Sequence, residues 1–136
     1  MLAVVDAGPL YAAADADDND HLECLAILER SDLVLVIPAL VITEVAYLIG
    51  TRLGPGAEAA FLGSLAQFEV EAPSADDWTN IALMVDRYGD FPLGGVDASV
   101  AVLADRLGTD LVITLDHRHF AAIRSTSGGT YHLLPG

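Results

Sequence analysis

The 136-residue sequence contains no lysine, and all six of its basic Lys or Arg positions are arginine. Phosphate-binding loops and Schiff-base sites both require a lysine side chain, so these two kinds of site are excluded. Twenty aspartates and glutamates bring the formal net charge to −14 at pH 7. Because affinity for nucleic acid grows with the phosphates that Lys and Arg neutralise, this charge argues against simple basic-patch binding.

Cysteine is almost absent too, with Cys24 as the single example. One cysteine allows neither an intrachain disulfide nor a multi-cysteine metal site, and this favours an intracellular protein. The apolar start of the chain has no basic residues before it and reaches Asp6 after five residues. It matches neither a signal peptide nor a membrane span, so we expect a cytoplasmic protein without membrane association.

Hydrophobic residues, in contrast, make up 53% of the chain, and the mean hydropathy is +0.46. Disordered chains combine high charge with low hydrophobicity, so the acidity does not indicate disorder. A chain of this length buries about two-thirds of its extended surface on folding. We therefore expect one domain, residues 1–136, with a substantial core.

Short apolar segments alternate with helical patterns along the chain. The expected strands cover residues 2–5, 33–37, 68–72, 111–115 and 131–134. The expected helices cover residues 9–14, 19–30, 38–53, 57–66, 75–88, 96–107 and 117–124. Apolar strands without alternation are typical of parallel sheets that are buried on both faces. The sequence thus predicts an α/β sandwich with a central, mostly parallel sheet flanked by helices.

Four acidic residues occupy corresponding positions in these elements. Asp6 follows the first expected strand, and Asp116 follows the fourth. Asp97 lies in the first turn of the helix that precedes the fourth strand. Glu44 lies about two turns into the helix after the second strand, where the helical period places it beside an apolar stripe. We expect the Glu44 carboxylate to be half-withdrawn from water.

The carboxyl ends of parallel strands meet at one edge of a sheet, so these four carboxylates should converge. Converging carboxylates raise one another's pKa unless a cation lies among them, and no arginine obviously matches each acid. An all-oxygen set of ligands favours Mg²⁺ or Mn²⁺. Such a metal lowers the pKa of bound water and stabilises charge on a phosphodiester, which is the chemistry of a nuclease.

Each acid taken alone also has a structural interpretation. An aspartate after a strand often caps the next helix, which would account for Asp6 and Asp116. Asp97 would interact favourably with a helix dipole. Glu44 is the acid that such interpretations explain least. The residues by themselves leave the structural and the catalytic interpretations open.

Five short motifs occur in order along the chain: Val5–Leu10, Thr43–Val45, Pro92–Ser99, Thr114–Phe120 and Leu133–Pro135. Together they resemble PIN-domain proteins, specifically the VapC toxins of bacterial type II toxin–antitoxin pairs. The resemblance spans nearly the whole chain. It implies a three-layer sandwich whose acidic cluster binds Mg²⁺ or Mn²⁺ and hydrolyses RNA phosphodiester bonds.

By matching positions, the resemblance implies that Asp6, Glu44, Asp97 and Asp116 are the catalytic, metal-binding acids. It makes Asp6 and Asp97 the direct ligands, while Glu44 and Asp116 complete the coordination, hold waters or support a second metal. Such toxins usually dimerise and are silenced by a cognate VapB antitoxin. We therefore expect a homodimer, a VapB-like partner and an RNA substrate of the tRNA or rRNA class.

One position departs from the family pattern. Gly8 stands where many relatives carry Ser or Thr, so its backbone amide or a water would have to replace that hydroxyl. We interpret Gly8, Thr114 and Arg118 as candidate substrate-binding residues. The alternatives are a β-branched core role for Thr114 and an ordinary surface position for Arg118. His117 and His119 are interpreted as inert surface histidines, with a role as general acid or base in catalysis as the alternative.

Other functions share parts of this pattern. A receiver-type regulatory domain needs a lysine after a late strand, and this chain has none. An aspartyl-nucleophile phosphatase needs a second aspartate two residues after the first, at the position of Gly8. A PIN nuclease that matures RNA or acts on DNA, and an inert PIN-like binding module, remain as alternatives.

Overall fold

A five-stranded sheet forms the centre of the molecule in a computed structural model that describes residues 1–136. Its strands are β1 (Leu2–Val5), β2 (Val34–Pro38), β3 (Glu69–Glu71), β4 (Leu111–Ile113) and β5 (His132–Leu134). Their order across the sheet is β3-β2-β1-β4-β5, and every neighbouring pair is parallel. The predicted sandwich is confirmed, with a sheet that is parallel throughout rather than mostly parallel.

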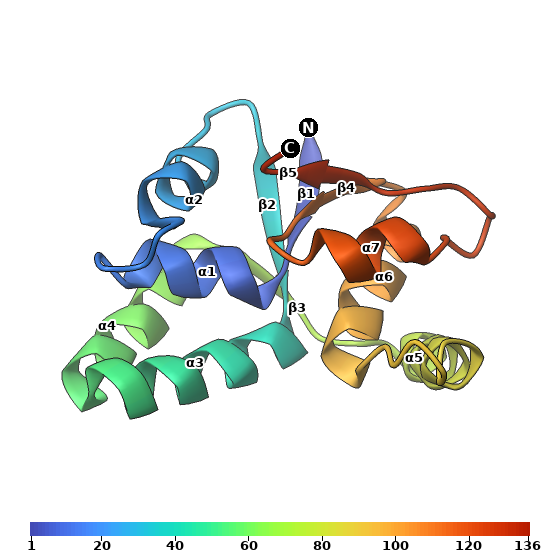
Figure 1. Ribbon diagram of the computed structural model, residues 1–136, viewed down its shortest axis with the longest axis horizontal. Coiled ribbons are helices and arrows are strands. Elements are labelled where there is room, and N and C mark those ends of the chain that lie inside the picture. Colours follow the sequence, from blue (N-terminus) through green and yellow to red (C-terminus); the bar gives the residue numbers. More distant parts are fainter.

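Helices cover both faces of this sheet (Figure 1). They are α1 (Ala7–Ala14), α2 (His21–Leu28), α3 (Ala39–Leu53), α4 (Pro55–Ser64), α5 (Ala75–Arg87), α6 (Gly95–Leu107) and α7 (His117–Ala122), with a short 3₁₀ helix at Leu65–Gln67. The helices α1 to α4 lie on one side and α5 to α7 on the other. Right-handed crossovers require this division, because the chain first moves outward from β1 to β3 and then crosses to β4.

The central strand explains why the apolar segments show no alternation. Ala3, Val4 and Val5 of β1 are fully buried, since helices pack on both faces of the sheet. On one of these faces α6 contacts β1, β2 and β4, and every residue from Ala98 to Ala104 is buried. The first turn of α6 is therefore held in a fixed position, because the rest of the same helix is buried in the core.

The boundary between β2 and α3 differs from the prediction for a local reason. Pro38 is the last residue of β2 and pairs with Glu71, instead of opening the following helix. Its ψ of 137° is extended, so it occupies the N-cap of α3. At the start of α5, Ser74 and Asp77 form a capping box by exchanging backbone-to-side-chain hydrogen bonds. None of the helices combines the length and apolar composition needed to cross a bilayer.

Candidate metal centre

The candidate site lies at the carboxyl-terminal edge of the sheet, where β1 and β4 end beside each other. The chain leaves β1 toward β2 and later returns on the opposite side as β4, so this is the topological switch point of the sheet. The backbone N–H of Asp6 donates to the carbonyl of Ile113 at 2.9 Å. Sheet pairing thus fixes the backbone that carries the first of the predicted acids.

Asp6 is the most deeply buried of these acids, with only 5% of its surface exposed. The pKa of Asp6 is raised from 3.8 to about 6, chiefly by burial and in smaller part by the charges on Asp97 and Glu44, while hydrogen bonds from the Ala7 backbone and the Thr114 hydroxyl oppose the rise. The carboxylate form is therefore disfavoured in the protein alone. A cation beside Asp6 would stabilise that form.

Thr114 connects the ends of the two central strands. Its hydroxyl donates to Oδ2 of Asp6 at 2.8 Å and accepts from the backbone N–H of Asp116 at 2.9 Å. Thr114 has no exposed surface, so the structure does not place it where a substrate could touch it, in contrast to the interpretation as a substrate-binding residue. In the structure its hydroxyl orients Asp6 instead.

Asp97 and Asp116 approach each other from α6 and from the segment after β4. Burial raises the pKa of Asp97, the charges of Asp116 and Glu44 raise it too, and His119 opposes them. The side chain of Asp116 caps α7, with Oδ1 accepting from the His119 backbone N–H at 3.1 Å and Oδ2 lying 2.6 Å from Nδ1 of His119. The helix-capping interpretation of Asp116 is thus correct, and the same carboxylate also belongs to the acidic site.

Three of these side chains have the spacing of metal ligands. One ligand atom each from Asp97, Asp116 and His119 lies within 4.8 Å of the others. The four ion pairs of the protein leave Asp6, Glu44 and Asp97 without a partner, and the His119 imidazole is the only basic group paired in the site. A divalent cation fits this donor set, because it would neutralise carboxylates that the protein itself does not.

Glu44 is exposed, so the prediction that its carboxylate is half-withdrawn from water is wrong. The buried stripe of α3 consists of Val41, Val45 and Ile49, and the Glu44 side chain lies outside it. The charge of Glu44 nevertheless raises the pKa of both Asp6 and Asp97. The structure therefore brings all four predicted acids to one edge of the sheet, with Glu44 on its solvent side.

The two remaining predicted residues lie at this edge with different surroundings. A Cβ atom built on Gly8 would meet the Leu115 side chain at 3.4 Å, which is ordinary van der Waals contact. Arg118 is exposed on α7, and its guanidinium carbon lies 5.6 Å from the centroid of the Phe91 ring. Arg118 forms no ion pair that would compete with a phosphate.

Sequence reasoning missed His119 as part of the site. Its side chain is 23% exposed, and its ring packs edge-on against Phe91 with centroids 4.9 Å apart. The sequence signal that could have identified it is the separation of three residues between Asp116 and His119. In a helix this spacing brings the side chain of the N-cap residue against the N3 residue.

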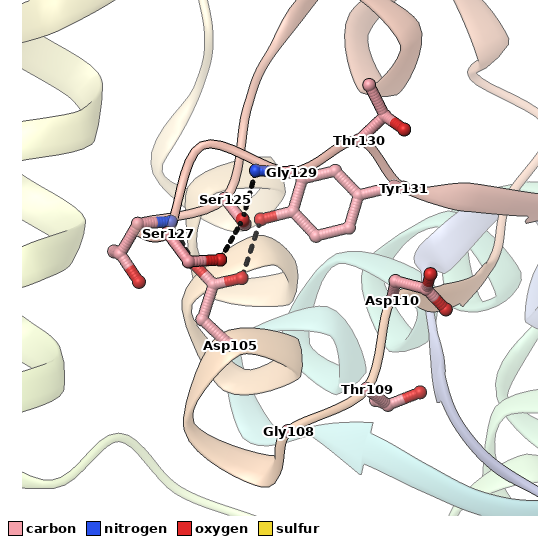
Figure 2. Close-up of a pocket in the computed structure, with 10 residues that line it drawn as sticks. Asp105, Gly108, Thr109, Asp110, Ser125, Ser127, Gly129, Thr130 and Tyr131 are labelled. Carbon is pink, nitrogen blue, oxygen red and sulfur yellow. Dashed lines mark hydrogen bonds between the residues drawn. The ribbon is translucent and has the colours of Figure 1, made fainter.

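A separate surface pocket lies away from the acids. It measures about 570 Å³ and opens at the amino ends of β4 and β5, between the end of α6 and the loop 125–130 (Figure 2). Asp105 closes one wall by accepting from the Tyr131 hydroxyl at 2.9 Å and from the Thr126 backbone N–H at 2.9 Å. These bonds tie the loop to α6, so the polar groups around this cavity stabilise the fold at the edge opposite the acids.

The family model named PIN domain matches residues 3–125. The chain is also 37% identical over 134 residues to Ribonuclease VapC26 of Mycobacterium tuberculosis (strain ATCC 25618 / H37Rv). The alignment covers 97% of this chain and 99% of that protein. The chain therefore belongs to the PIN-domain family and, through its full-length relative, to the VapC group within it.

Solved structures share this fold at low identity. Mycobacterium tuberculosis VapC20, described as a sarcin-ricin loop cleaving toxin, superposes with a TM-score of 0.73 at 20% identity, over 81% of this chain and 86% of that one. VapBC2 from Rickettsia felis, solved with a DNA fragment from its promoter, gives a TM-score of 0.72 at 15% identity, over 98% of each chain. At such low identities the similarity shows a shared fold and nothing more specific.

Proposed function

We propose that this chain is a metal-dependent endoribonuclease and the toxin of a type II toxin–antitoxin pair, with residues 1–136 acting as one PIN domain. The observation that carries the proposal is the group of carboxylates around Asp6. Asp6 itself is buried and has no cationic partner. The full-length relative named as a ribonuclease supports RNA as the substrate. RNA cleavage would take place in the cytoplasm, where the substrate is found.

In this proposal Asp6 and Asp97 hold Mg²⁺ or Mn²⁺, and Asp116 and Glu44 complete the coordination or hold its waters. The bound metal would lower the pKa of a water molecule and stabilise charge on the scissile phosphodiester. The Asp6 carboxylate is oriented for this role by the Thr114 hydroxyl at 2.8 Å. Two hydrogen bonds from His119 orient the Asp116 carboxylate in the same way.

The substrate is held by few positive groups. The exposed guanidinium of Arg118 and the backbone N–H of Gly8, in the first turn of α1, are the groups that we assign to phosphate contacts. A protein with a net charge of −14 repels RNA at long range. Binding then depends on the metal and on the shape of the target, which favours selective cleavage of a structured RNA of the tRNA or rRNA class.

The acidic surface also suits the proposed partners. A VapB-like antitoxin would silence the enzyme by placing a basic side chain among the unpaired carboxylates, where it would replace the metal. Structural neighbours that are complexes of VapB with VapC support this assignment. We propose a homodimer as the assembly, as is usual for such toxins.

Inducible expression of the wild type beside Asp97→Asn, with sequencing of RNA 5′ ends, tests the proposal. We expect the wild type to arrest growth and produce a dominant new 5′ end. The variant should lose at least about 100-fold in kcat/KM, since a metal supplies several kcal/mol of charge stabilisation.

Asp86→Asn is the matched control, because it removes the same charge from an exposed position on α5. It should behave as the wild type does. Undiminished RNA cleavage by Asp97→Asn would overturn the site assignment. Cleavage of DNA alone, or of no nucleic acid at all, would point to the other PIN-domain functions.

A further inference from the structure

His119 lies inside the acidic site, yet the four-carboxylate arrangement assigns it no direct role. We propose that its imidazole is a nitrogen ligand of the bound metal, so that the centre has mixed oxygen and nitrogen donors and prefers Mn²⁺ to Mg²⁺. This inference rests on the proposed function, because it requires the acids to bind a divalent metal.

The spacing of the donor atoms is the first argument. A ring nitrogen of His119 and carboxylate oxygens of Asp97 and Asp116 lie within 4.8 Å of one another. Donor atoms at such separations can share one ion with modest movement, given metal–ligand distances of about 2.0–2.3 Å. Asp97 comes from α6, whereas Asp116 and His119 lie at the start of α7, so the three donors surround a common space from two elements.

The His119 ring is held in position before any metal binds. Nδ1 lies 2.6 Å from Oδ2 of Asp116, and the His119 backbone N–H donates to Oδ1 of the same residue at 3.1 Å. The Phe91 ring packs edge-on against the imidazole with centroids 4.9 Å apart. A side chain restrained in this way loses little rotamer freedom on coordination, which is the property of a preorganised ligand.

The chemistry of the imidazole predicts which metal gains from it. Imidazole is a ligand of transition metals, whereas Mg²⁺ prefers oxygen donors and keeps several of its waters. A histidine that ligates a metal and also bonds a carboxylate is a common arrangement around such ions. Loss of His119 should therefore weaken Mn²⁺ binding much more than Mg²⁺ binding.

A purely orienting role is the competing explanation, in which His119 only fixes the Asp116 carboxylate. Two substitutions separate the roles. His119→Ala removes both the donor to Asp116 and the ring nitrogens. His119→Asn retains an amide donor near the position of Nδ1 but offers the metal no imidazole. An orienting role predicts that His119→Asn keeps wild-type metal binding, whereas a ligand role predicts that it loses Mn²⁺ affinity as His119→Ala does.

The test measures Mn²⁺ and Mg²⁺ binding by isothermal titration calorimetry, together with nitrogen modulation in pulsed electron paramagnetic resonance of the Mn²⁺-loaded protein. We expect nitrogen modulation in the wild type and its loss in both His119 variants. Mn²⁺ affinity should fall by about 10-fold or more in both, with a change in Mg²⁺ affinity of less than about 3-fold. His117→Ala, which changes an exposed histidine of the same helix, should retain wild-type values.

Absence of nitrogen modulation in the wild type, or wild-type Mn²⁺ binding by His119→Asn, would overturn the inference. Asp97→Asn tells this failure from a failure of the proposed function. If Asp97→Asn loses metal binding and RNA cleavage while the His119 variants keep both, only the histidine ligand is wrong. If Asp97→Asn also keeps both, the metal centre itself is wrong.

Discussion

Asp6 is an acidic residue whose charged form is destabilised by the fold that buries it. Its carboxyl group is buried at the end of β1, and burial raises its pKa to about 6. Natural proteins keep such costly groups mainly where they serve a function. At the residue scale, the metal-free protein should therefore be destabilised by the same group that we propose as a metal ligand.

This destabilisation has a defined dependence on pH. The folded state binds the Asp6 proton more tightly than the unfolded chain does, so stability falls as pH rises from about 4 through about 6 and then levels off. A shift from 3.8 to about 6 corresponds to a loss of about 3 kcal/mol at pH 7. The raised pKa of Asp97 adds a loss of the same sign.

Asp6→Asn should remove most of this loss, because the amide is neutral and its oxygen still accepts from the Thr114 hydroxyl. We expect the metal-free variant to melt at a higher temperature than the wild type at pH 7, and at nearly the same temperature near pH 4. Thermal melts in a chelator across this range measure the effect. A wild type whose stability does not fall between pH 4 and 6, with Asp86→Asn as the exposed control, would contradict it.

At the scale of elements, α6 carries Asp97 and contacts β1, β2 and β4 as well as α5. Asp77 of α5 helps to hold that arrangement. Its carboxylate caps α5 by accepting from the Ser74 backbone N–H at 3.0 Å, and it accepts from Nε of Arg106 on α6 at 2.8 Å. Arg106 also lies 3.6 Å from Glu71 at the end of β3, so one arginine joins three elements.

Asp77→Ala should destabilise the protein by about 2–3 kcal/mol, since it removes a buried partner of Arg106 and half of a capping box. For a chain of this size that corresponds to a fall in Tm of about 5–10 °C. Asp76→Ala changes an exposed aspartate of the same helix turn and should cost well under 1 kcal/mol. Equal melting temperatures for the two variants would show that the contact with Arg106 contributes little.

At the scale of the whole molecule, charge determines how the substrate arrives. Two of the six arginines, Arg30 and Arg106, are paired with acids, which leaves few positive groups to attract a polyanion. Association with RNA is therefore opposed by long-range repulsion rather than assisted by attraction.

Raising monovalent salt from about 20 to about 150 mM, at fixed metal concentration, screens that repulsion because the Debye length falls to about 8 Å. We expect kcat/KM for RNA cleavage to rise or stay level over this range. A protein that binds through a basic surface would instead lose activity steeply. A steep loss here would indicate a positive RNA-binding surface that this monomer lacks and that an oligomer would have to supply.

The sequence by itself determined the alternation of strands and helices and the identity of the four acids. Apolar β-branched segments, helix-capping residues and helix-ending glycines act locally, so they are readable without knowledge of the fold. The Ser74–Asp77 capping box is an example, because all of its atoms lie within four residues.

Only the tertiary structure decided how those acids are surrounded. The exposure of Glu44, the burial of the Thr114 hydroxyl against Asp6 and the packing of Phe91 on His119 all depend on contacts between elements. Asp6 and Thr114 are 108 residues apart in the chain. Such contacts follow from the pairing of β1 with β4 and from the burial of α6, and no local pattern records them. The sequence therefore identified the charges of the site, while the fold set their solvation, hydrogen bonds and neighbours, which govern how they can bind a metal.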